Sequence, residues 1–156
     1  MEYKIEYGEV MKLVEEEVSR EAGQAISADG VSLYDSIRMV SRDEGKKKRL
    51  MSEVLVAIKS QCNRFFSSVA FDEGTNEPES LVFELNLSTR RSSGRKLSLM
   101  TMFRSLTVNL ILNKFFISKN LTDLASKYDE AALADVQALA KLLYEKLPPV
   151  YPTIDE

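Results

Sequence analysis

The sequence predicts a mainly helical fold, a bundle of about four helices with one β-strand or short hairpin at about residues 81–99 and an extended C-terminal tail. Three observations lead to this prediction. Apolar residues recur at helical spacing over most of the chain. One stretch, residues 81–87 (LVFELNL), alternates clearly like a strand. Two prolines, Pro148 and Pro149, end the last helical pattern.

The length of 156 residues suits one domain, residues 1–156, whose last part, 148–156, forms the tail. A chain of this size can bury roughly 70% of the surface that its unfolded form exposes, so it needs no disulfide. The chain has one cysteine, Cys62, and no histidine. An intramolecular disulfide, the common zinc sites and the Ser–His–Asp and Cys–His catalytic sets are therefore excluded.

The first helix is predicted from about Glu9, where apolar residues begin to recur on one face. Residues 3–7 before it alternate and suit a short strand. Gly23 or the stretch 27–30 ends the helix.

The second helix is predicted to begin near Ser32, a residue type that favours the N-cap. Gly45 predicts a kink or a break, because a glycine inside a helix costs roughly 1 kcal/mol relative to alanine. The apolar pattern then continues to about residue 70 as one long amphipathic helix.

A loop is predicted over residues 71–80, followed by the strand and a polar, basic, flexible segment at 88–96. Residues 98–117 are apolar nearly all round and predict the central helix of the core. The last helix starts at Asn120 or Thr122 and is rich in alanine, which favours close helix packing.

The strand at 81–87 leaves a row of backbone N–H and C=O groups that need a partner. Within the chain, residues 3–7, 96–99 or the tail could pair with it and form a two- or three-stranded sheet. A strand of another subunit could also pair with it, and this is our leading hypothesis. The predicted subunit interface comprises Leu81, Phe83, Leu85, Leu87, Tyr151 and Ile154.

Charge is unevenly distributed along the chain. Residues 1–30 carry three Lys/Arg and eight Asp/Glu, whereas residues 31–60 carry seven and four. If the helix continues through Gly45, the basic residues from Arg38 to Arg49 form one positive stripe on it. A second basic patch lies on the flexible segment 88–96, and two such patches could bind phosphates. The candidate contacts to DNA or RNA are Arg38, Arg42, Lys46, Arg49, Arg90, Arg91 and Arg95. A pI of 5.2 and the lack of aromatic residues in both patches argue against a dedicated nucleic-acid binder.

The sequence predicts no catalytic, metal or cofactor site. The adjacent carboxylates at residues 15–17 point in different directions on a helix and suit a solvated face. The six glycines form no phosphate-binding loop. Cys62 lies on an apolar stripe and suits a buried small residue.

A cytoplasmic location is predicted. The N-terminal residues are charged and do not resemble a signal peptide. The most apolar stretch is interrupted by Arg104 and Lys114, which leave nine uncharged residues between them. A membrane span needs about 20, so no membrane association is expected.

The second half of the chain has a distinct layout: the strand LVFELNLS, the apolar helix LSLMTMFRSLTVNLILNKFFIS, the break KNLTD, a helix with an early tyrosine and a proline-bearing tail. Over residues 80–152 this layout resembles small helical proteins from the structural modules of tailed phages and prophages of gut bacteria, which are similar to head–tail connectors. Where those proteins carry an aromatic pair with a tryptophan, this chain has Phe115 and Phe116.

The resemblance implies a non-enzymatic virion component of a bacterial host cell that forms a ring with itself and contacts neighbouring assembly proteins. It carries over no catalytic residue. Two alternatives stay open from the residues alone. One is a small DNA- or RNA-associated accessory protein that uses the basic stripe, and the other is a bacterial helical adaptor that binds a partner helix.

Overall fold

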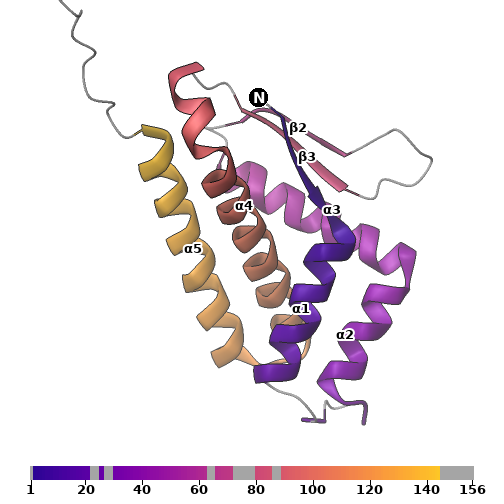
Figure 1. The fold of residues 1–156 in the computed structure, drawn as a ribbon. Helices are drawn as coiled ribbons and strands as arrows, with labels where there is room; N and C mark the ends of the chain where they lie inside the picture. Colours follow the sequence, from indigo (N-terminus) through magenta and orange to yellow (C-terminus); the bar gives the residue numbers. More distant parts are fainter. Residues whose placement is uncertain are drawn as a thin grey trace, which may run out of the picture.

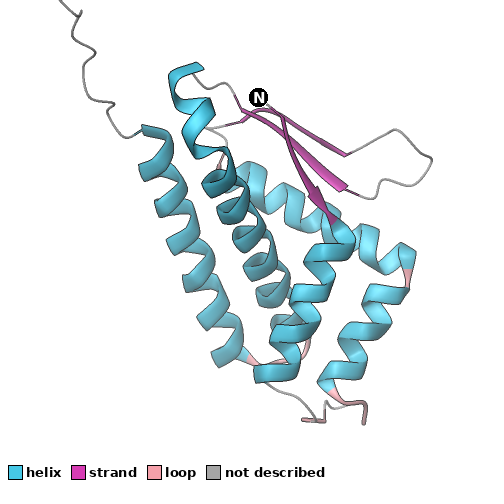
Figure 2. Ribbon diagram, in the orientation of Figure 1, coloured by secondary structure: helices cyan, strands magenta, loops and turns pink. Residues whose placement is uncertain are grey.

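The computed structural model describes residues 2–21, 25–26, 30–62, 66–71, 80–85 and 89–144. A small β-sheet lies across one end of a helical bundle (Figures 1 and 2). The elements are, in order, β1 (Glu2–Glu6), α1 (Tyr7–Glu21), α2 (Leu33–Arg42), α3 (Glu44–Gln61), β2 (Phe66–Phe71), β3 (Ser80–Leu85), α4 (Thr89–Ser118) and α5 (Thr122–Tyr144). The predicted mainly helical class is confirmed.

The core is one hydrophobic cluster to which all five helices contribute. As predicted, α4 is central to it: Phe103, Leu106, Ile111 and Phe116 are fully buried. The ring of Phe116 stacks on Tyr128 of α5 with centroids 5.6 Å apart. Helices α4 and α5 lie side by side as an antiparallel pair (Figure 1).

The turn between α4 and α5 explains where α4 ends. Asn120 has a φ of +58°, a left-handed conformation that asparagine tolerates better than most residues. The N–H of Leu121 donates to the carbonyl of Phe116 (3.0 Å), and the N–H of Asn120 donates to that of Ile117 (3.1 Å). This Schellman arrangement satisfies the last carbonyls of α4 and reverses the chain.

The predicted kink or break near Gly45 is a break, and it lies at Asp43, which is at once the C-cap of α2 and the N-cap of α3. The described residues therefore form five helices, where about four were predicted. The Asp43 carboxylate accepts a hydrogen bond from the backbone N–H of Lys46 (3.1 Å). This N–H lies in the first turn of α3 and has no carbonyl partner within the helix. An aspartate that can cap stops the helix two residues before Gly45.

The predicted helix end near residue 70 is wrong. Helix α3 ends at Gln61, and residues 66–71 (FSSVAF) form β2 instead of a helical end. The spacing of Phe66 and Val69 suits a helix, but aromatic and β-branched residues also favour strands. Pairing with β3 decides between the two, and a contact so distant in sequence cannot be read from local periodicity.

The strand predicted at 81–87 is confirmed over residues 81–85, which belong to β3, whereas residues 86–87 lie outside the described residues. The sheet order is β1-β3-β2, and both pairings are antiparallel. Phe83 faces Tyr3 of β1 on one side and Val69 of β2 on the other. Because both hydrogen-bonding edges of β3 are occupied within the chain, the hypothesis that this strand pairs with another subunit is wrong.

The flexible segment predicted at 88–96 is also wrong, because α4 already begins at Thr89. Extending a helix by one residue is easier than nucleating it, so the strongly apolar part of α4 can propagate into the polar residues before it. The loop residues 72–79, Leu87 and the predicted tail lie outside the described residues. In the described part of the chain, no helix is long and apolar enough to cross a membrane.

Candidate functional site

The basic residues predicted to form one stripe are divided between two helices. Arg38 and Arg42 belong to α2, whereas Lys46 and Arg49 belong to α3. The condition for a single stripe, a helix continuous through Gly45, is therefore not met. The guanidinium of Arg38 lies 5.5 Å from the centre of the Tyr34 ring on its own helix.

The second predicted patch, Arg90, Arg91 and Arg95, falls in the first turns of α4, not in a flexible loop. The side chains of these three residues lie outside the described ones.

Lys46 and Arg49 instead meet Lys114 of α4 around a hollow of about 210 Å³, which we call the cationic hollow. It lies between the start of α3, the end of α2 and the last turns of α4. Its lining residues are Val40, Lys46, Arg49, Leu50, Glu53, Lys114, Phe115 and Ser118.

The cationic hollow combines an apolar floor with a positive rim. Phe115 is buried, and Val40 and Leu50 are half-buried. Three cations face one carboxylate, Glu53, whose Oε1 lies 3.5 Å from the Nε of Arg49. Across the described ranges, no carboxylate pairs with the ammonium groups of Lys46 and Lys114. The rim therefore retains positive charge that a ligand could use.

The size of the hollow indicates what it could bind. Pockets for drug-sized molecules span roughly 300–1,000 Å³, and the cationic hollow is smaller than that. It is open and could take one or two side chains of a protein segment. Apolar anchors surrounded by charges are typical of protein interfaces.

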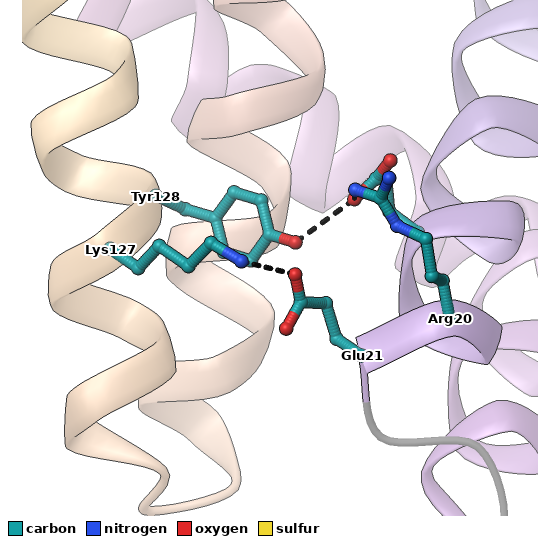
Figure 3. Close-up of polar contacts among 5 residues, drawn as sticks. Arg20, Glu21, Lys127 and Tyr128 are labelled. Carbon is teal, nitrogen blue, oxygen red and sulfur yellow. Dashed lines mark hydrogen bonds and ion pairs between the residues drawn. The ribbon is translucent and has the colours of Figure 1, made fainter.

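A second concavity, of about 500 Å³, lies between α1, α4 and α5, and we call it the polar cleft. Figure 3 shows its α1–α5 side. The Tyr128 hydroxyl donates to the Glu17 carboxylate (3.0 Å), which also accepts from Arg20 (2.5 Å). Lys127 forms an ion pair with Glu21. These contacts join α5 to the last turns of α1.

On the α4 side of the polar cleft, Asp135 of α5 accepts hydrogen bonds from Ser105 (2.9 Å) and from Asn109 (2.7 Å). Arg104 forms an ion pair with Glu9 of α1, with 3.4 Å between the Nη2 of Arg104 and the Oε2 of Glu9. These contacts across helices fix how α1, α4 and α5 pack. The Nε of Arg104 is buried and has no hydrogen-bond partner among the described residues.

Local surroundings shift the pKa of three side chains in the described structure. The hydrogen bond from Lys127 lowers the pKa of Glu21 below its ordinary value. Burial, assisted by Glu17, raises the pKa of Tyr128. Burial also raises the pKa of the Cys62 thiol to about 11, so the thiol stays protonated at neutral pH.

The predicted interface residues fall into two groups. Leu81, Phe83 and Leu85 occupy the central strand β3, and their side chains are not among the described ones. Leu87, Tyr151 and Ile154 lie outside the described residues.

Lys114 and Phe115 were not predicted as functional candidates from the sequence, where Lys114 is only a charge that interrupts an apolar stretch. A cation among apolar residues could have marked the edge of a surface site, but the meeting of Lys114 with Lys46 and Arg49 depends on how α3 packs on α4.

Comparisons with known protein families, with curated proteins and with solved structures found no match.

Proposed function

We propose that this chain is a non-enzymatic assembly protein, which joins copies of itself and neighbouring assembly proteins through the cationic hollow. The observation that supports this proposal is the pairing of an apolar floor with three cations in a concavity of side-chain size. A protein segment with an apolar side chain and adjacent acidic residues matches both features.

The energetics of such a contact are favourable. Burying one large apolar side chain contributes about 1.5–3 kcal/mol. The cations around it select against basic segments and increase the rate at which acidic ones associate. One anchor alone gives a weak contact, and repeating it around an assembly strengthens the whole.

A more specific form of the proposal is a virion component at the head–tail junction of a tailed phage or prophage, where the chain forms a ring in the bacterial host cell. Its support is the layout shared with helical connector-like proteins over residues 80–152. Mass spectrometry of purified virions from a host that carries the gene should detect the chain. If the purified virions do not contain the chain, a role in the virion is excluded, whereas the general assembly function is still proposed.

A helical adaptor is the alternative that the same hollow favours. It would use the cationic hollow for a segment of a different protein and would not self-associate. A nucleic-acid role has less support, because the break at Asp43 divides the predicted stripe and leaves Lys46 and Arg49 beside an apolar floor.

Size-exclusion chromatography with light scattering tests self-assembly. The monomer has a mass of 17.6 kDa, and we expect the wild type to exceed it. Lys114→Glu and Arg49→Glu each reverse a charge at the rim and should shift the protein toward monomer. Lys59→Glu is the matched control, because Lys59 is an exposed lysine of α3 outside the hollow. A wild type that stays monomeric at all concentrations would contradict the proposal in favour of the adaptor.

A further inference from the structure

We propose that the occupant of the cationic hollow is the tail of a second copy of this chain, residues 148–156. Its apolar residues Tyr151 and Ile154 would contact the floor, and Asp155 and Glu156 would face the cations. This inference rests on the proposed function, since it names the partner of the same site.

The composition of the tail complements the hollow. Residues 148–156 (PPVYPTIDE) contain three large apolar residues, Val150, Tyr151 and Ile154, and two acidic ones, and they contain no lysine or arginine. The floor consists of Val40, Leu50 and Phe115, and three cations surround it. Prolines at 148, 149 and 152 restrict the free chain, so the tail loses less conformational entropy when it binds.

The tail of the same copy is poorly placed to fill the hollow. Helix α5 starts next to the hollow end of α4 and runs to the opposite end of the bundle (Figure 1). With 23 residues it is about 34 Å long. Tyr151 is the seventh residue after Tyr144, and seven fully extended residues span at most about 25 Å. Among the described residues that line the hollow, none belongs to α5.

Fully extended, the ten residues from Tyr144 to Ile154 span at most about 36 Å, so Ile154 would reach its own hollow only as a nearly straight chain along the whole of α5. The hollow of a neighbour sets no such requirement. A contact between the tail of one copy and the hollow of another is heterologous, since a different surface of each copy takes part. Heterologous contacts generate closed rings or open filaments, depending on the rotation between neighbours. The inferred contact is therefore of the type that a ring requires.

Disulfide cross-linking between copies tests the occupant directly. One variant carries Ser118→Cys at the exposed edge of the hollow, and the other carries Ile154→Cys in the tail and a tag that changes its size. Native Cys62 is buried and should not form a disulfide in this experiment. After the two variants are mixed and mildly oxidised, we expect a covalent dimer that contains one copy of each.

Two controls define the specificity. Ala134→Cys places a thiol at an exposed position of α5 away from the hollow, and with Ile154→Cys it should cross-link at least about tenfold more slowly, which corresponds to roughly 1.4 kcal/mol. Adding Lys114→Glu to the Ser118→Cys copy should also slow the cross-link. Circular dichroism verifies that every variant keeps its helices.

Several results would overturn the inference. Equal cross-linking through Ala134→Cys would mean random collision. A rapid intramolecular disulfide in a dilute Ser118→Cys/Ile154→Cys double variant would mean that the tail binds its own hollow. If the Lys114→Glu protein loses its oligomer but the tail never cross-links at Ser118→Cys, another segment occupies the hollow and only the inference fails. A wild type that is always monomeric would refute the inference and the proposed self-assembly together.

Discussion

The hydroxyl of Tyr128 is the residue-scale contact that best tests the packing of α5 on α1. It donates to Glu17 over 3.0 Å. Hydrogen bonds to charged groups contribute roughly 1.5–3 kcal/mol, and the partly exposed carboxylate places this one at the lower end. Tyr128→Phe should therefore lower the free energy of unfolding in urea. Tyr34→Phe, at a half-buried tyrosine of α2, is the control. Equal effects of the two substitutions would contradict a specific role for this bond.

The ion pair between Lys127 and Glu21 should make stability depend on pH. The hydrogen bond from Lys127 lowers the pKa of Glu21 in the folded state. A lowered pKa stabilises the fold above the unfolded-state pKa of about 4.3, and this contribution is lost as the pH falls through the folded pKa. The difference in stability between wild type and Lys127→Gln should thus shrink from neutral pH to about pH 3. A difference that is constant over this range would show that the substitution acts through something else.

Cys62 gives a simple test of burial. Burial raises the pKa of its thiol to about 11, whereas a free cysteine has a pKa of about 8.5. We expect a thiol reagent to label the native protein very slowly at pH 8 and the urea-unfolded protein rapidly. Rapid labelling of the native state would contradict the position of Cys62 at the end of α3.

At the scale of elements, α4 should dominate stability. Leu106 is fully buried, and Leu106→Ala should lower the free energy of unfolding by about 2–5 kcal/mol. Leu133→Ala on α5 is the matched control, because Leu133 is 57% exposed. Chemical unfolding compares the two variants. A loss at position 106 no larger than at position 133 would remove α4 from the core.

The central position of β3 changes what a proline there should do. Phe83 has partners in both β1 and β2. Proline cannot donate to the ladder and is not tolerated in a central strand. We expect Phe83→Pro to lower the melting temperature of the protein, because it disrupts both pairings of β3. An effect limited to the dissociation of subunits is not expected. A variant that melts like the wild type would show that β3 does not pair as described.

For the whole molecule, the sequence predicted what local patterns determine. The apolar surface of residues 98–117 identified the core helix, and the alternation at 81–87 identified β3. Pairing between distant segments was not predictable in this way. The choice of helix or strand for FSSVAF depends on β3, and the break at Asp43 depends on one side chain competing with the helix. The cationic hollow requires α3 to pack on α4, so of its lining residues only Lys46 and Arg49 were predicted as functional candidates from the sequence.

The central claim is that a neighbour's tail in the cationic hollow joins the copies, and a mixing experiment tests it most directly. Lys114→Glu impairs the hollow but leaves the tail intact, and Ile154→Asp impairs the tail but leaves the hollow intact. Each variant alone should sediment as a 17.6 kDa monomer in analytical ultracentrifugation. Their mixture has one intact tail and one intact hollow, so it should form a one-to-one dimer and nothing larger. A mixture that stays monomeric while the wild type forms a larger assembly, or single variants that keep the wild-type mass, would contradict the claim.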